Sequence, residues 1–230
     1  MSKKVRKEFD LGGKNFILET GELAGQANGS VLAQYGETVV LATAVSQPLS
    51  SKIDYFPLSV DYEEKLYAGG KISTSRFIKR ENRPTEEAVL TSRLIDRSIR
   101  PLFPKDYLAE VQVIITVLSV DQQNDPDIVS LVATSAALAI SDIPWNGPLA
   151  GIRVGKQNGI FILNPTEEEK KLSNLDLVIA SNEKEVVMVE AEGSEIIEDV
   201  IVEGLKFAVE QGKIVIDKIE GETVYLTNYS

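Results

Sequence analysis

Two strand-length runs on either side of a tight turn place the strongest constraint on the fold of this chain. Ser30–Tyr35 alternates polar and apolar residues, and Thr38–Val45 is rich in β-branched residues and nearly all apolar. Gly36-Glu37 lies between them, and a two-residue connection that begins with glycine is typical of a β-hairpin. The sequence therefore predicts an antiparallel pair of strands in the first third of the chain.

Further segments of strand and helix character follow in a mixed order. Strands are predicted at Phe16–Glu19, Phe56–Tyr62, Val111–Asp121, Gly151–Val154, Gly159–Leu163, Leu175–Ala180 and Val186–Glu190. Helices are predicted at Pro84–Arg100, from Asp125-Pro126 to about Ile140, and at about Ser194–Gly212, with a loose tail at Gly221–Ser230. This order predicts a single α+β domain with mixed β-sheets packed against helices.

The amino-acid composition excludes several kinds of chemistry. The chain has 230 residues and contains neither cysteine nor histidine, so disulfides, thiolate nucleophiles and Ser-His-Asp catalysis are absent. Any reaction must use carboxylates, hydroxyls, Lys, Arg, backbone amides or a hard metal ion. No apolar run approaches the roughly 20 residues of a membrane span. We therefore expect no contact with a membrane and a location in the cytoplasm.

Charge is distributed unevenly along the chain. The net charge is -11, from 24 Lys and Arg against 35 Asp and Glu. Between Lys71 and Lys105, however, nine basic residues stand against four acidic ones. A basic segment in an acidic protein is a candidate site for a polyanion, because its field is local while the remaining surface repels non-specific binding.

Three arginines within this segment are spaced for one face of the predicted helix. Arg93, Arg97 and Arg100 stand at i, i+4 and i+7. Such a row can contact successive phosphates through planar, bidentate guanidinium groups. The alternative is that these arginines complement the C-terminal helix dipole and pair with Asp96 and with acids at the sheet edge.

The loop before this helix combines an aromatic ring with positive charge. Phe77 stands among the basic residues Arg76, Lys79, Arg80 and Arg83. This combination suits single-stranded nucleic acid, because bases stack on the ring and phosphates meet the cations. The alternative is a solvated loop with Phe77 packed into the core. Since the loop and the helix adjoin in the sequence, the two together favour nucleic-acid binding.

Other polar patterns in the chain are weaker signals. Residues Gly25–Ser30 contain glycine but match neither the dinucleotide-binding nor the P-loop pattern, so we expect a turn there. Asp121, Asp125 and Asp127 lack EF-hand spacing, and Asp125 is expected to cap a helix rather than bind a metal ion. The charged run Glu167–Lys171 is expected to be a solvated face.

Four long segments carry a resemblance to a known family. Ser75–Pro104, with the sequence SRFIKRENRPTEEAVLTSRLIDRSIRPLFP, resembles the corresponding region of bacterial polynucleotide phosphorylases. Gly25–Ala44, Asp54–Ile72 and Phe161–Ser181 match the same family in order and spacing. The resemblance covers the first of the family's two RNase PH-like halves. It implies an RNase PH-like domain over residues 1–219 and a tail over residues 220–230, where a helical linker would begin.

The resemblance also implies an activity and its requirements. Family members are polyribonucleotide nucleotidyltransferases, phosphorolytic 3′-to-5′ exoribonucleases that degrade single-stranded RNA to nucleoside diphosphates. Inorganic phosphate is the co-substrate, and Mg²⁺ is bound mainly by the second half of the family enzyme. The family enzyme is a homotrimeric ring, so the implied partners are single-stranded RNA, further copies of the chain and the RNA-degradation machinery.

Site residues are carried over from the family position by position. The family's RNA-gripping loop reads Phe77-Ile78-Lys79-Arg80 here, where Ile78 lacks an aromatic face and Lys79 lacks the bidentate fork of arginine. The resemblance implies RNA-binding roles for Phe77, Lys79, Arg80, Arg93, Arg97, Arg100 and Arg153.

The catalytic acids of the family belong to its second half. Asp176 stands at one matching position, but the residue six positions earlier is Lys170, which in its charged form cannot bind Mg²⁺. Asp176 is therefore a weak catalytic candidate, with capping or ion pairing as the alternative, and no metal site is expected in this chain. We expect a half that binds RNA and builds the ring. The alternative is a non-catalytic RNA-binding or scaffold subunit that acts with a separate catalytic partner.

Overall fold

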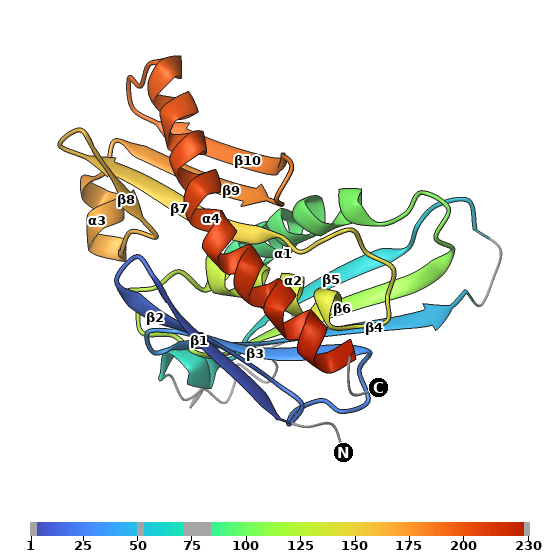
Figure 1. Ribbon diagram of the computed structural model, residues 1–230. Coiled ribbons are helices and arrows are strands. Elements are labelled where there is room, and N and C mark those ends of the chain that lie inside the picture. Colours follow the sequence, from blue (N-terminus) through green and yellow to red (C-terminus); the bar gives the residue numbers. More distant parts are fainter. Residues whose placement is uncertain (1–3, 50–52, 71–83, 228–230) are drawn as a thin grey trace.

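The structure is a computed structural model, and it describes residues 4–49, 53–70 and 84–227. Within these ranges the chain forms two β-sheets with helices between and beside them (Figure 1). The strands are β1 (Val5–Leu11), β2 (Lys14–Thr20), β3 (Gly29–Tyr35), β4 (Thr38–Pro48), β5 (Leu58–Glu64), β6 (Ala109–Ser119), β7 (Ala150–Gln157), β8 (Ile160–Leu163), β9 (Leu175–Ser181) and β10 (Val186–Gly193). The helices are α1 (Glu86–Ile99), α2 (Pro126–Ala139), α3 (Glu167–Leu172) and α4 (Glu198–Thr227), and short 3₁₀ helices lie at Leu66–Gly69 and Arg100–Leu102.

The two sheets differ in size and in strand direction. The larger sheet has the strand order β1-β2-β3-β4-β6-β5, and in it only β5 and β6 run parallel. Parallel neighbours need a long connection, and α1 lies in the segment that joins these two strands. The smaller sheet has the order β10-β9-β7-β8 and is antiparallel throughout. The predicted α+β class with mixed sheets is confirmed.

The predicted hairpin joins β3 to β4. Tyr35 pairs with Thr38 across the turn, and Gly36 has a φ of +61°, in the left-handed region that favours glycine. A Cβ atom on Gly36 would lie 2.3 Å from Nδ2 of Asn124. Both the backbone angle and the space therefore require glycine at this turn.

Helix α2 lies between the two sheets and forms the centre of the core. Every residue from Ile128 to Leu138 is buried, as expected for a helix that is apolar on all sides. The helix contacts β3 and β4 of the larger sheet and β7 of the smaller one. Gly29 in β3 allows a close approach, because a Cβ atom there would lie 2.0 Å from the carbonyl oxygen of Ala137.

Helix α4 is longer than the sequence predicts. The helix predicted over about Ser194–Gly212, with a loose tail after residue 220, instead runs over Glu198–Thr227. Gly212 lies inside the helix, where a Cβ atom would be 3.0 Å from Cβ of Ala150, so this glycine allows close packing against β7 and does not end the helix. Figure 1 shows α4 crossing from the smaller sheet to the larger one, and it contacts β7, β9 and β1. Among the described helices, none has the length and apolarity needed to cross a bilayer.

Two elements are absent from the sequence prediction. Strand β1 pairs with β2 along its whole length, from Val5 opposite Thr20 to Leu11 opposite Lys14. Its charged residues obscure the alternation of polar and apolar side chains by which a strand is predicted. Helix α3 is the run expected to be a solvated face. Its start is marked by a capping box in which Thr166 and Glu169 each accept a hydrogen bond from the backbone N–H of the other.

Replacing Gly29 with alanine should destabilise the fold by about 1–3 kcal/mol, because the added methyl group overpacks the contact between β3 and α2. Gly25→Ala is the matched control, since a Cβ atom at Gly25 would have nothing within 4 Å. Urea unfolding of the two variants measures the difference in the free energy of unfolding. Equal stability of the two variants would contradict the close approach at Gly29.

Candidate nucleic-acid interface

The three arginines predicted for one face of α1 are all exposed, but they meet different surroundings. Arg97 reaches across to β10, where its Nη1 donates to Oε1 of Glu190 at 2.6 Å. Arg93 is one helical turn earlier, and no hydrogen bond or ion pair joins its side chain to any described residue. Among the described residues, none competes with a ligand for the positive charge of Arg93.

Arg100 is used to hold the end of α1 against the protein. Its Nε and Nη2 donate to the carboxylate of Asp96 at 3.0 and 2.6 Å. Its Nη1 and Nη2 also donate to the backbone carbonyls of Phe56 and Leu58 at 3.3 and 3.1 Å. The contact with Asp96 matches one part of the alternative considered for the arginine row, and Arg97 makes the other part, a pair with an acid at a sheet edge, through Glu190 of the edge strand β10. The RNA contact implied for Arg100 stays a prediction.

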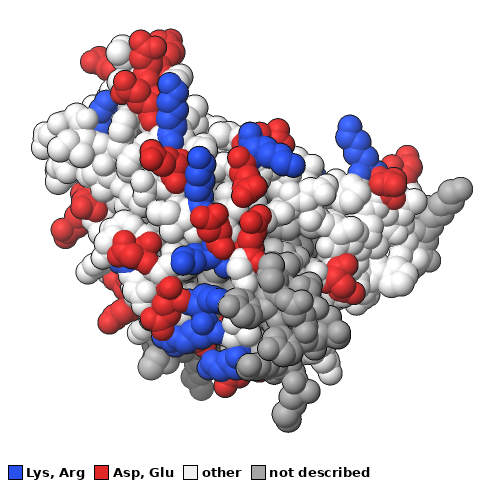
Figure 2. All heavy atoms as spheres, viewed as in Figure 1, with Lys and Arg blue, Asp and Glu red and all other residues white. Residues whose placement is uncertain are grey.

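The basic loop before α1 lies outside the described residues. Phe77, Lys79 and Arg80 belong to it, so their RNA-binding roles stay predictions. On the face that α4 crosses, Figure 2 shows basic side chains lying beside acidic ones. In its described part, that face does not present the continuous positive charge that suits a polyanion.

A groove of about 630 Å³ opens beside α1, and α2, α3, β7 and β10 also contribute to its lining. Most of its charged side chains are acidic, which disfavours the approach of RNA phosphates to its floor. Its apolar and hydroxyl lining comes mainly from α1. The acidic residues are Glu64, Glu87, Asp125, Asp127, Glu167, Glu190 and Glu192, and the basic ones are Arg153 and Lys170.

The two basic residues of the groove are bound to carboxylates. Nε of Arg153 donates to Oδ1 of Asp176 at 2.7 Å, its Nη2 donates to the other oxygen of Asp176, and its Nη1 contacts Asp125. Nζ of Lys170 lies 3.1 Å from Oδ2 of Asp125. Strand pairing explains part of this arrangement, because Arg153 lies opposite Val178 in β9 and is a diagonal neighbour of Asp176. We call these four side chains, Asp125, Arg153, Lys170 and Asp176, the ion-pair network.

The ion-pair network fixes the roles of the residues in it. Asp125 caps α2 as predicted, because its side chain accepts the backbone N–H of Asp127 at 3.1 Å. Burial works against the charge of Arg153, whose side chain is 16% exposed, but Asp176 and Asp125 outweigh it and raise the pKa. Asp176 adopts the pairing role that was its alternative to catalysis. The RNA contact implied for Arg153 stays a prediction.

Magnesium does not fit the ion-pair network. Both oxygens of Asp176 accept hydrogen bonds from Arg153, and the position six residues earlier holds the cation Lys170. A hard metal ion would meet two positive charges where it needs oxygen ligands. In the part of the chain that the structure describes, no group of three or more Asp, Glu, Cys or His side chains is arranged to hold a metal ion.

Asp121 organises the loop before α2. Its carboxylate accepts backbone N–H groups of Glu37 at 2.9 Å and of Gln123 and Asn124 at 2.8 Å. Burial disfavours the charged form, but these hydrogen bonds outweigh it and lower the pKa of Asp121 to about 2. Asp121 and Asp125 therefore serve separate structural roles and do not form a common metal site.

Asp127 lies in the first turn of α2 and faces α1. Its Oδ1 accepts the hydroxyl of Thr91 at 2.7 Å. Burial raises the pKa of Asp127 to about 7, and the neighbouring carboxylate of Asp125 adds to the rise, while Thr91, Arg153 and Lys170 act against it. The contact between α1 and α2 therefore contains a carboxyl group that holds its proton in mildly acidic solution.

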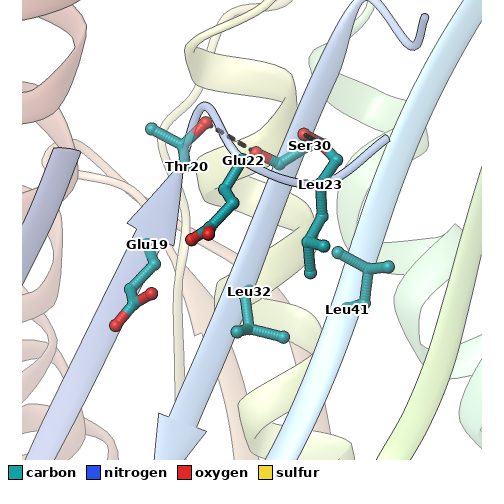
Figure 3. A pocket seen from close by; sticks show the side chains of 7 residues that line it. All are labelled: Glu19, Thr20, Glu22, Leu23, Ser30, Leu32 and Leu41. Atoms are coloured by element: carbon teal, nitrogen blue, oxygen red, sulfur yellow. Dashed lines mark hydrogen bonds between the residues drawn. The ribbon is translucent and has the colours of Figure 1, made fainter. Parts of the chain in front are cut away.

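A second, small pocket lies on the larger sheet (Figure 3). Leu32 and Leu41 line it from neighbouring strands, and Leu23 reaches in from the loop after β2. Its space of about 20 Å³ suits about one water molecule. Glu19 at its edge pairs with Lys4 at 3.2 Å. This pocket is too small for a nucleotide, and its acidic lining does not suit a phosphate.

Asp127→Asn should remove part of the pH dependence of stability. In the unfolded chain an aspartate has a pKa of about 3.9, while Asp127 in the folded chain has a pKa of about 7. Between these values the folded state holds the extra proton, so rising pH lowers the free energy of unfolding of the wild type. The stability of the variant relative to wild type should rise by up to about 1.4 kcal/mol per pH unit in this window. Urea unfolding at several pH values measures the free energy of unfolding of both proteins. The same dependence on pH in variant and wild type would contradict the raised pKa.

Arg153→Met should lower the free energy of unfolding by about 1–3 kcal/mol, because the half-buried carboxylate of Asp176 would lose its partner and Asp125 would keep only Lys170. Adding Asp125→Asn and Asp176→Asn to this variant should recover part of the loss, since both carboxylates are then neutral. Urea unfolding at neutral pH measures both changes. A single variant as stable as wild type would show that the ion-pair network does not support the fold.

Comparison with protein families gives two adjoining matches. Residues 12–144 match domain 1 of the 3′ exoribonuclease family, and residues 147–211 match domain 2 of that family. The polyribonucleotide nucleotidyltransferase of Rhodospirillum centenum is 54% identical over 95% of this chain and 31% of its own length. The protein of that name from Thermus thermophilus is 53% identical over 88% of this chain and 28% of its own length. The chain thus spans about a third of the length of these relatives.

Solved structures share the fold of this chain. Rrp46 of rice has a TM-score of 0.73 at 16% identity and covers 90% of this chain and 94% of its own. An Archaeoglobus fulgidus exosome with RNA bound to the active site has a TM-score of 0.67 at 18% identity, over 94% of this chain and 88% of that one. These likenesses confirm the predicted RNase PH-like fold. With both domains in order, as in the N-terminal half of polyribonucleotide nucleotidyltransferases, this chain belongs to the 3′ exoribonuclease family.

Proposed function

We propose that this chain is the RNA-binding and ring-building part of a polyribonucleotide nucleotidyltransferase. The whole enzyme would degrade single-stranded RNA from its 3′ end by phosphorolysis and release nucleoside diphosphates. Identity above 50% to proteins of that name supports the reaction class. Because the chain spans only about a third of those relatives, we assign it a share of the reaction and not the whole.

The ion-pair network is the observation that supports a catalytic centre outside this chain. Phosphoryl transfer needs a metal ion or free basic groups that neutralise charge on the transferring group. Here Arg153 and Lys170 are bound to Asp125 and Asp176, so neither the cations nor the carboxylates are free for that task. We therefore infer that Mg²⁺ and the co-substrate phosphate are bound outside this chain and that the chain alone is inactive.

The basic segment carries the proposed RNA binding. Arg93 offers an exposed guanidinium without a described partner, and Arg97 offers a second one on the same face of α1. Phe77, Lys79 and Arg80 of the preceding loop would add a stacking surface and further charge. The acidic remainder of the protein supports this assignment, because it keeps RNA from binding elsewhere on the surface.

Assembly and location follow from the same family relationship. We propose that residues 1–219 form one RNase PH-like unit and that residues 220–230 lead toward the helical linker. Three copies would form a ring around the RNA, in contact with other proteins of RNA degradation. We place this activity in the cytoplasm, where single-stranded messenger RNA is turned over.

The purified 230-residue chain should bind labelled single-stranded RNA but release no nucleoside diphosphate when Mg²⁺ and phosphate are added. Arg93→Ala should weaken RNA binding and reduce the slope of log K against log salt by about 0.7, because one phosphate contact is lost. Lys184→Ala is the matched control, since it removes an exposed lysine that does not line the groove.

Two results would overturn parts of this proposal. Release of nucleoside diphosphate that depends on phosphate would show that the chain contains a complete active site. Unchanged affinity and salt slope in a folded Arg93→Ala variant would show that the exposed face of α1 does not contact RNA. The circular dichroism spectra of the variants establish that each one is folded.

A further inference from the structure

We propose that Glu190 competes with RNA for Arg97 and so makes the second RNA contact of α1 conditional on the first. This inference rests on the proposed RNA binding by α1. In free protein, the Glu190 carboxylate would occupy one donor of Arg97. RNA already held at Arg93 would then displace the carboxylate with a phosphate oxygen. Glu190 would thereby set how tightly this face grips a strand.

The geometry of the pair supports displacement. The Oε1 atom of Glu190 accepts from Nη1 of Arg97 at 2.6 Å, and no other hydrogen bond of this guanidinium is formed with a described residue. The two side chains are 55% and 42% exposed, so a ligand can reach the contact from solvent. A carboxylate oxygen and a phosphate oxygen accept hydrogen bonds from a guanidinium in the same way, so Glu190 occupies the donor that a phosphate of RNA would use.

Comparison with the neighbouring arginines singles out Arg97. Arg100 is held by both oxygens of Asp96 and by two backbone carbonyls, and Arg153 is held by two carboxylates away from solvent. Breaking either set would leave several polar groups without partners. Within the described ranges Arg97 has a single partner, the exposed Glu190, and such pairs are weak because solvent screens them. Arg97 is therefore the arginine whose partner RNA can replace.

The position of Arg93 makes the exchange conditional. Arg93 and Arg97 are four residues apart in α1, which separates them by about 6 Å along the helix axis. A strand bound to Arg93 thus brings its neighbouring phosphates close to Arg97 at high local concentration. An anion that does not engage Arg93 lacks this advantage and must compete with Glu190 from bulk solution.

The strand that carries Glu190 offers a matched control. Glu192 stands two residues further along β10, so its side chain leaves the same face of the sheet. Glu192 also lines the groove and is exposed, but no hydrogen bond or ion pair joins it to a described residue. Glu192→Gln therefore removes the same charge from the same surface without releasing an arginine.

Glu190→Gln should tighten the binding of labelled single-stranded RNA about twofold to fivefold and steepen its salt dependence, because Arg97 becomes free. Glu192→Gln should tighten binding less, through reduced repulsion alone. In an Arg97→Ala background, Glu190→Gln should have no larger effect than Glu192→Gln. Fluorescence anisotropy titrations at several salt concentrations measure all of these affinities.

The outcomes distinguish the competition by Glu190 from the RNA binding by α1 on which it rests. Equal effects of Glu190→Gln and Glu192→Gln, or an effect of Glu190→Gln that persists without Arg97, would overturn the competition while leaving RNA binding by α1 intact. Weaker binding of Glu190→Gln would also overturn it. If Arg93→Ala leaves RNA binding unchanged, the proposed RNA-binding face itself is wrong.

Discussion

The burial of α2 between the two sheets is the constraint on which the rest of the structure depends. This helix can lie there because its residues from Ile128 to Leu138 are small or apolar and because Gly29 lets β3 approach its backbone. The start of this helix lies at the groove, which Asp125, Pro126 and Asp127 line. Asp125 and Asp127 are thereby placed within reach of β7 and α1, so the core determines the charge pattern of the groove.

Burial also divides the charged side chains of this region into two kinds. Where little solvent reaches the charges, as around Arg153, opposite charges hold each other more firmly, because separating them would leave a half-buried charge without a partner. At the rim, as between Arg97 and Glu190, water competes with the pair and the contact is weak. The partly buried network is expected to support the fold, whereas a ligand can replace one member of the exposed pair.

The sequence was sufficient for most of the fold because strand and helix periodicity are local properties. The hairpin at Gly36, the buried strand around Val113 and the cap at Asp125 each depend on a few neighbouring residues. The length of α4 was not predictable in this way, because Gly212 faces Ala150 only in the folded chain. A glycine signals either a helix end or a close contact, and the sequence alone does not separate these.

The candidate site was less predictable, because its contacts join distant parts of the chain. Arg153 and Asp125 are 28 residues apart, Lys170 and Asp125 are 45 apart, and Arg97 and Glu190 are 93 apart. The arginine spacing correctly placed three side chains on the exposed side of α1, but helical spacing carries no information about which acid of β10 and which carbonyl of β5 lie nearby. Only the pairing of strands and the packing of α1 supply those partners.

The half-buried carboxyl of Asp127 has a consequence for a protein that contains no histidine. In most proteins imidazole groups exchange protons near neutrality, and here a carboxyl with a pKa of about 7 does so instead. In mildly acidic solution the folded chain keeps a proton that the unfolded chain gives up. Folding is then coupled to proton uptake from the buffer, so the heat measured on unfolding includes the ionisation heat of whichever buffer receives that proton.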